Sequence, residues 1–161
     1  MTFIPLLART VGLGNSGWFF TLVALVILIL RAKGGTLSDR FGRIPVVAPS
    51  LVCAGVAVWL IGFLGSIPGI LLAGVGFAAG FGLASPALMA MATDGVPPEE
   101  RGRAMGTLQT AWELGIGTGA LALGQLLSWT GGNFGITYGV SGAITLAGAA
   151  LALRARPRRA R

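Results

Sequence analysis

Long uncharged stretches separated by short charged segments dominate the chain. No charged residue occurs from Thr10 to Leu30, and a second uncharged run extends from Ile44 to Thr93. A third run, Ala104 to Leu153, is interrupted only by Glu113. The first run suits one helix of about 20 residues across a bilayer, whereas a helix of about fifty residues would extend about 75 Å against a hydrocarbon layer of about 30 Å. Each longer run is therefore predicted to form a hairpin of two spanning helices.

Turn signals divide the two longer runs. They are "GSIPG" at Gly65 to Gly69 and "SWTGGNFG" at Ser128 to Gly135. The predicted fold is an all-α integral membrane bundle of five full transmembrane helices, in one half-domain covering 1–161. The apolar residues 1–8 look like the end of a further, truncated N-terminal helix. The spans are expected at residues 12–31, 45–64, 69–92, 104–127 and 134–153, followed by a cytoplasmic tail at 154–161.

The basic residues predict the orientation of this bundle. Because a two-span hairpin returns to the side on which it started, eleven cations share one face, which the positive-inside rule assigns to the cytoplasm. They are Arg31, Lys33, Arg40, Arg43, Arg101, Arg103, Arg154, Arg156, Arg158, Arg159 and Arg161. The opposite turns carry no charge and are flanked by aromatic residues, as at a membrane interface. We expect a multi-pass protein of the plasma (inner) membrane with a cytoplasmic C-terminus.

Composition narrows the classes of function. The chain of 161 residues is 54% hydrophobic and 11% charged, with a mean hydropathy of +0.82, so a soluble domain is excluded. It has no histidine and one cysteine, which leaves neither a catalytic triad nor a metal site, and we expect no enzyme activity, cofactor or metal. The net charge is +7, and five of the twelve cations lie in the basic tail at 154–161. Topology and attraction to anionic membrane lipid explain that tail better than nucleic-acid binding.

Glycine pairs with a spacing of four residues recur inside the apolar runs. Small residues at this spacing allow helices to approach closely in membranes. The pairs are Gly76 and Gly80, Gly115 and Gly119, and Gly135 and Gly139. They indicate helix packing and not a nucleotide-binding loop, because they lie inside predicted spans.

The segment "GGTLSDRFGR", Gly34 to Arg43, combines glycines, an aspartate and two arginines in a short link between predicted spans. Gly35 and Gly42 allow a tight turn, and Asp39 can cap a helix or pair with a guanidinium. Arg40 and Arg43 can bind carboxylates or helix C-terminal carbonyls. Ordinary positive-inside charge would account for the arginines, but poorly for the aspartate and glycines.

This segment resembles the signature G-x-L-x-D-R-x-G-R of major facilitator superfamily transporters. Together with the flanking "FIPLLARTVGLGNSGWFFTLVALVILILRAKGG", it is similar to the C-terminal half of a twelve-helix, drug-efflux-like member. Thr36 departs from the pattern, since a basic residue is common there. The resemblance implies a conformational latch at Gly35, Asp39, Arg40, Gly42 and Arg43. Local latch partners are expected at Glu99, Glu100 and Arg101, although the acids also suit the first turn of a helix behind Pro98.

Glu113 is the candidate residue for transport chemistry. Counted from Ala104, it lies about 14 Å along its helix, near the bilayer centre, where a carboxylate should face a cavity or a partner. Desolvation there suits a group that couples to protons or recognises cations. Gln109 and Thr110 lie one turn earlier and share its face. The alternative is a carboxylate that is paired structurally with a group outside this chain.

These observations favour a secondary active transporter that moves a small organic solute by alternating access, driven by protons, and present here as a C-terminal half. No ATP-binding motif occurs in the sequence. Two alternatives stay open. The chain is a truncated fragment that does not transport, or it is a half-size subunit that pairs with an N-terminal half or with a second copy of itself.

Overall fold

The computed structural model describes residues 2–10, 12, 17–64 and 66–154. Within these residues the chain is helical and contains no strand. The elements are α1 (Ile4–Thr10), α2 (Gly17–Phe41), α3 (Arg43–Ile61), α4 (Ile67–Thr93), the 3-10 turn η1 (Pro98–Glu100), α5 (Arg101–Trp129) and α6 (Phe134–Arg154).

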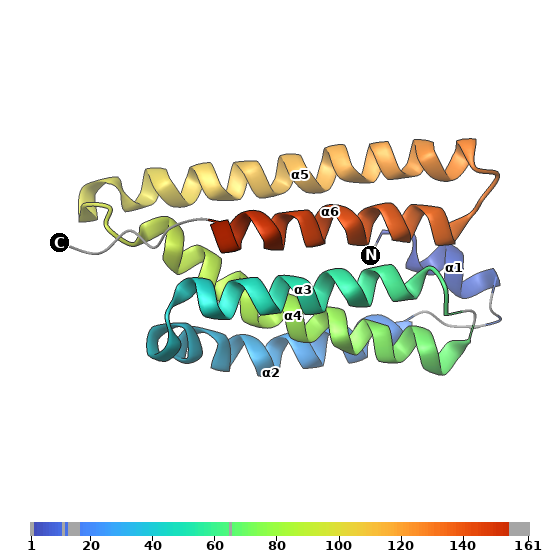
Figure 1. Cartoon of the computed structure of the whole chain (residues 1–161), viewed down its shortest axis with the longest axis horizontal. Helices are drawn as coiled ribbons and strands as arrows, with labels where there is room; N and C mark the ends of the chain where they lie inside the picture. Colours follow the sequence, from blue (N-terminus) through green and yellow to red (C-terminus); the bar gives the residue numbers. More distant parts are fainter. Residues whose placement is uncertain (1, 11, 13–16, 65, 155–161) are drawn as a thin grey trace.

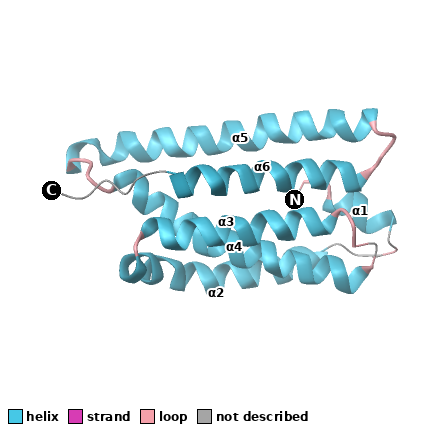
Figure 2. Cartoon of the chain, viewed as in Figure 1, coloured by secondary structure: helices cyan, strands magenta, loops and turns pink. Residues whose placement is uncertain are grey.

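The five long helices run side by side as a bundle (Figures 1 and 2). Helix α3 packs against α4 and α6, and α2 packs mainly against α4. Helix α5 lies at the edge and meets α4 and α6 along short stretches. Helices α2, α4 and α6 end, and α3 and α5 begin, at one end of the bundle, which we call the basic end. Its described cations are Arg40, Arg43, Arg101, Arg103 and Arg154.

Among the described residues, four helices are long and apolar enough to cross a membrane: α2, α3, α4 and α6. This supports the predicted integral membrane helical bundle, but not the count of five full spans. Helix α5 has the length, with 29 residues, yet it carries Glu113, two arginines and several glycines, which lower its hydropathy. The short α1 occupies the place of the expected truncated helix.

The described helices differ from the predicted spans mainly at α2. The predicted span stopped at Arg31, but the helix continues through the motif to Phe41. Charged residues at the end of an apolar run can remain helical, because the backbone hydrogen bonds continue wherever no glycine turn or proline interrupts them. Arg31 therefore lies within the helix, ten residues or about 15 Å before its end. The tail beyond Arg154 lies outside the described residues.

Glycines allow α3 to approach both of its main neighbours. A Cβ atom at Gly80 of α4 would overlap the carbonyl oxygen of Ser50 and lie 2.6 Å from the backbone nitrogen of Ala54. A Cβ atom at Gly142 of α6 would lie 2.8 Å from the carbonyl oxygen of Gly55. These contacts are the close backbone packing that small residues permit in membrane helices.

The predicted glycine pairs differ in what they contact. Gly80 is packed as expected, and Gly135 lies close enough to α3 for a Cβ to be 3.4 Å from the carbonyl oxygen of Gly62. In contrast, a Cβ at Gly115 or Gly119 would meet no described atom within 4 Å. The glycine face of α5 is therefore open in this structure.

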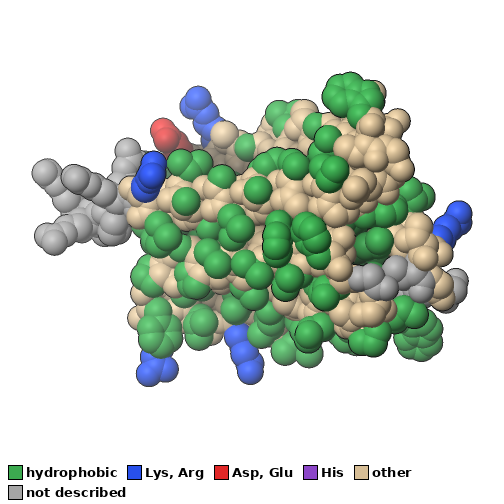
Figure 3. Space-filling model, turned by 45° about the vertical axis from the view of Figure 1, so that its right-hand side comes forward, with side chains coloured by type: hydrophobic (Ala, Val, Ile, Leu, Met, Phe, Trp, Pro, Cys, Tyr) green, Lys and Arg blue, Asp and Glu red, His purple; other side chains and the backbone are tan. Residues whose placement is uncertain are grey.

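Large apolar side chains cover much of the outer surface. Figure 3 shows hydrophobic side chains spread over one face, with Lys and Arg at its margins. Leu28 of α2, Leu72 of α4 and Leu151 of α6 are each more than 60% exposed. Acyl chains would cover such side chains in a bilayer, and the helices satisfy their own backbone hydrogen bonds.

The contact at Gly80 yields a stability prediction. Gly80→Ala places a methyl group against the rigid backbone of α3, so we expect the free energy of unfolding to fall by about 1–3 kcal/mol. Gly117→Ala is the matched control, because a Cβ there meets no described atom within 4 Å. Reversible unfolding in mixed micelles would measure both variants. Equal stability of the two would show that α3 and α4 do not pack at Gly80.

Candidate functional site

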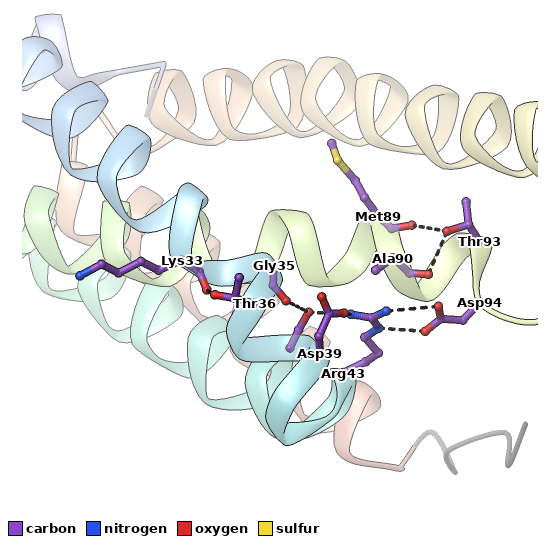
Figure 4. A network of polar contacts seen from close by, with 10 residues as sticks. Lys33, Gly35, Thr36, Asp39, Arg43, Met89, Ala90, Thr93 and Asp94 are labelled. Atoms are coloured by element: carbon purple, nitrogen blue, oxygen red, sulfur yellow. Dashed lines mark hydrogen bonds and ion pairs between the residues drawn. The ribbon is translucent and has the colours of Figure 1, made fainter.

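Arg43 stands at the centre of a polar network at the basic end (Figure 4). Its Nε donates to Asp94 Oδ2 at 2.9 Å and its Nη2 donates to Asp94 Oδ1 at 3.3 Å, a two-point contact. Its Nη1 donates to Asp39 and, at 2.8 Å, to the buried hydroxyl of Ser38. Arg43 therefore joins the end of α2, the start of α3 and the end of α4. The fork geometry of a guanidinium suits this role, and a lysine could not reproduce it.

Helix electrostatics explain why these three charges belong together. Arg43 is the first residue of α3, where the helix dipole disfavours a cation. Asp39 lies in the last turn of α2 and Asp94 caps the C-terminus of α4, where the dipole disfavours anions. Each charge alone would destabilise its own helix end. Together they neutralise one another, so the network couples the positions of the three ends.

Gly42 sets the geometry of the network. It is the residue between α2 and α3, and its φ of 91° lies in the left-handed region that favours glycine. The chain reverses there, and this brings Asp39 and Arg43 together across the turn. Pro45 follows in the first turn of α3, where its missing N–H costs no helical hydrogen bond.

The other residues of the predicted latch have different surroundings. Gly35 accepts a hydrogen bond from Ser38 Oγ through its carbonyl at 3.0 Å. The guanidinium of Arg40 lies 5.8 Å from the ring centre of Phe41, within cation–π range. Arg40 is exposed and makes no ion pair within the described residues.

The expected partners Glu99 and Glu100 form the turn η1, and Arg101 begins α5. In the part of the chain that is described, neither glutamate pairs with Arg43, and Arg101 Nε donates to the carbonyl of Val96 at 3.3 Å. Asp94, which was not among the predicted latch residues, forms the ion pair with Arg43 instead. The signal was present, because Asp94 is the first charge after the second apolar run and the hairpin topology returns it to the end that carries Arg43.

The ion pair also lowers the pKa of Asp94 below its ordinary value of 3.8. The main cause is the hydrogen bond from Arg43, and the charges of Arg43 and Arg101 add to it. Desolvation acts in the opposite direction but is smaller. The carboxylate is therefore ionised, and the network is complete, throughout the physiological pH range.

The second group of predicted residues lies on α5. Gln109 Nε2 donates to Glu113 Oε1 at 3.1 Å, one helical turn apart. Gln109, Thr110 and Glu113 are all exposed, because α5 lies at the edge of the bundle. All residues of α5 are described, and only Leu127 among them is buried. The structure thus brings Gln109 and Glu113 together, and Glu113 forms no ion pair within the described residues.

A groove of about 720 Å³ separates the glycine face of α5 from α6. Trp112, Gly115 and Gly119 line one wall, and Tyr138 and Ser141 line the other. Glu113 does not line this groove, because its side chain leaves the helix on another face. The polar site and the groove are therefore separate features of α5.

The family model described as Major Facilitator Superfamily matches residues 1–161, the whole chain. The chain belongs to this superfamily. The clamp of Arg43 by Asp39 and Asp94 is thus formed by the signature segment of a family member and one aspartate outside that segment.

Several curated proteins are similar to the chain. A probable chloroplastic anion transporter 4 of Arabidopsis thaliana is 35% identical over 74% of this chain and 23% of its own length. A 3-(3-hydroxy-phenyl)propionate transporter of Escherichia coli K12 is 28% identical over 72% of this chain and 30% of its own length. An uncharacterized MFS-type transporter YhhS of Salmonella typhi is 31% identical over 81% of this chain and 32% of its own length. The chain thus spans about a third or less of these relatives, and no solved structure matches it significantly.

The two-point contact predicts a measurable coupling between Arg43 and Asp94. A double-mutant cycle with Arg43→Gln and Asp94→Asn should give a coupling free energy of about 0.5–1 kcal/mol, since both side chains are partly exposed. Unfolding in mixed micelles would measure it. The matched cycle with Arg43→Gln and Glu99→Gln should give no coupling. A coupling confined to the second cycle would place Glu99, and not Asp94, beside Arg43.

The lowered pKa of Asp94 predicts how the clamp depends on pH. A carboxylate whose pKa falls on folding stabilises the folded state above its unfolded pKa, and this stabilisation is lost as pH falls through the folded pKa. The stability difference between wild type and Asp94→Asn should therefore be constant from about pH 5 to 8 and shrink below about pH 4. A difference that fell between pH 7 and 5 would contradict this assignment.

Proposed function

We propose that the chain is a helical bundle of a secondary active transporter that moves a small organic solute by alternating access. Family membership supports this proposal, and so do the transporter names of the relatives. The observation that carries it is the clamp at Arg43, which joins three helix ends through the family's signature segment. An interaction of paired charges at helix ends can open and close without unfolding a helix, as an alternating-access switch requires.

Glu113 is our proposed coupling residue, with Gln109 as its hydrogen-bonding neighbour. The carboxylate lies twelve residues, about 18 Å, along α5 from Arg101, inside the apolar run. A carboxylate inside a hydrocarbon layer is costly unless it faces a cavity or a partner, so a functional role explains its place there. Thr110 lies one residue after Gln109 and would extend the polar surface. We assign proton-coupled transport to this group.

The bundle is proposed to work with a second one. The open glycine face of α5 and its exposed polar residues would be covered by another helical bundle, either an N-terminal half or a second copy of the chain. A fragment that does not transport is the alternative. The mass of the chain in lipid nanodiscs distinguishes them, because a subunit forms a defined assembly and a fragment stays monomeric or aggregates.

The basic end is proposed to face the cytoplasm, in the plasma (inner) membrane. Its arginines support this orientation through the positive-inside rule, and Trp18, which is 76% exposed near the start of α2, suits the opposite interface. The C-terminus would then be cytoplasmic. The narrower interpretation as a drug-efflux antiporter rests on the motif resemblance described above.

Proton coupling through Glu113 is tested by flux. Residues 1–161 are reconstituted in liposomes that contain a pH-sensitive dye, and benzoate, choline or glucose is added outside as an anionic, cationic or neutral test solute. For a transported solute, we expect the wild type to change the internal pH and Glu113→Gln to lose at least about 90% of that change, a loss of the size that removal of a proton-transfer group causes. Glu113→Asp is the matched control and should retain it. Equal proton movement by wild type and Glu113→Gln would refute the assignment.

A further inference from the structure

A second cavity, of about 320 Å³, lies between α2, α4 and α5. It is separate from the groove between α5 and α6, and Trp112 is the residue that both share. Its lining combines three polar side chains with two aromatic rings and a thioether. The lining residues are Arg31, Phe81, Ser85, Met89, Gln109 and Trp112.

Arg31 supplies the charge of this cavity. It lies within α2, about 15 Å before the basic end, and its Nη2 approaches the sulfur of Met89 at 3.9 Å. A thioether is a weak acceptor, so the donors of the guanidinium remain largely unused. Within the described residues, no carboxylate lies within ion-pair distance of Arg31. A cation inside a spanning helix normally faces a partner or a cavity, and here it faces the cavity.

Ser85 supplies a buried hydroxyl without a partner. Its side chain is 2% exposed, and its Oγ has no hydrogen-bonding partner in the described structure. An unsatisfied buried hydroxyl is costly, and hydroxyls in membrane helices usually bond to a carbonyl of the preceding turn. Ser85 does not, although it lies on the wall of the cavity. A bound group that accepts a hydrogen bond would remove this cost.

Gln109 and the aromatic rings complete the lining. The Nε2 group of Gln109 uses one of its two N–H donors on Glu113, which leaves the other unassigned. The rings of Phe81 and Trp112 meet edge to face, with centroids 5.6 Å apart. A cavity of this size is at the small end of the range for ligand sites, about 300–1,000 Å³. It would hold a molecule with about one ring.

We propose that this cavity binds a small organic carboxylate, with its oxygens on Arg31 and Ser85 and its apolar body between Phe81 and Trp112. Among the described residues that line the cavity, every polar side chain can donate a hydrogen bond, the one charge is positive and there is no acid, so an anionic acceptor suits this lining best. A carboxylate satisfies a guanidinium fork at two points. This inference deepens the proposed function, on which it rests, by naming the class of solute.

The test measures binding and needs no transport. Residues 1–161 are placed in nanodiscs of zwitterionic phosphatidylcholine, and the affinity for 4-fluorobenzoate is measured by fluorine NMR. The neutral isostere 4-fluorobenzamide should bind at least about tenfold more weakly, because it lacks the charge that strengthens a hydrogen bond to Arg31.

Three variants locate the site. Arg31→Gln should weaken binding of 4-fluorobenzoate by about tenfold or more, and Ser85→Ala by about two- to tenfold. Lys33→Gln is the matched control, because it removes an equal charge from the same helix at a residue that does not line the cavity. It should leave the affinity unchanged. Thermal unfolding in the same nanodiscs verifies that each variant is folded, and Ser85→Ala removes only one oxygen atom.

Three outcomes would overturn the proposal. They are equal binding of acid and amide, equal effects of Arg31→Gln and Lys33→Gln, and displacement of the probe by phosphatidylglycerol added to the nanodisc, which would make the site a lipid site. The result is independent of flux. Binding that depends on Arg31 without any flux would refute the proposed transport and support the proposed binding site. Proton-coupled flux without such binding would refute the binding site and support the proposed transport.

Discussion

Close approach of helix backbones along α3 is the constraint on which the rest of the bundle depends. Membrane helices satisfy their own backbone hydrogen bonds, and burying an apolar side chain from lipid contributes little, so association depends on close packing. Gly80 of α4 and Gly55 and Gly142 at the contact with α6 allow that packing. Because α4 and α6 pack against α3, the links between successive helices place the ends of α2, α4 and α6 and the starts of α3 and α5 together at the basic end.

The clamp at Arg43 depends on this arrangement of α2, α3 and α4. Its three charges stand at helix ends where the dipoles disfavour them, and the pairing relieves that conflict only while α2, α3 and α4 keep their relative positions. A shift of any one of these helices would therefore disturb the contacts of the other two. The proposed alternating-access switch would therefore depend on the combined contacts of Asp39, Arg43 and Asp94, since the strength of one exposed ion pair is small.

Helix α5 contrasts with the packed part of the bundle. Except at Gly124, a Cβ atom on its glycines would meet no described atom within 4 Å, most of its residues are exposed, and it carries Gln109 and Glu113. A helix with low hydropathy that is poorly packed is an unfavourable component of an isolated membrane bundle. Its polar residues would be stabilised by a cavity or a second bundle beside them, and Arg31 and Ser85 line one cavity next to α5.

The sequence by itself determined the helical membrane class, the two hairpins and the signature segment, because uncharged runs, turn residues and cations are local properties that a bilayer restricts to few arrangements. It also indicated turns at Gly35 and Gly42, but only Gly42 lies at a turn, whereas Gly35 lies inside α2. The tertiary structure alone decided that α2 continues through the motif, that Asp94 pairs with Arg43, and that Arg31, Ser85 and Gln109 share a cavity. Those facts depend on how helices far apart in the chain are rotated and placed against one another, and this is set by side-chain packing between helices and not by the hydrophobic pattern along any one of them.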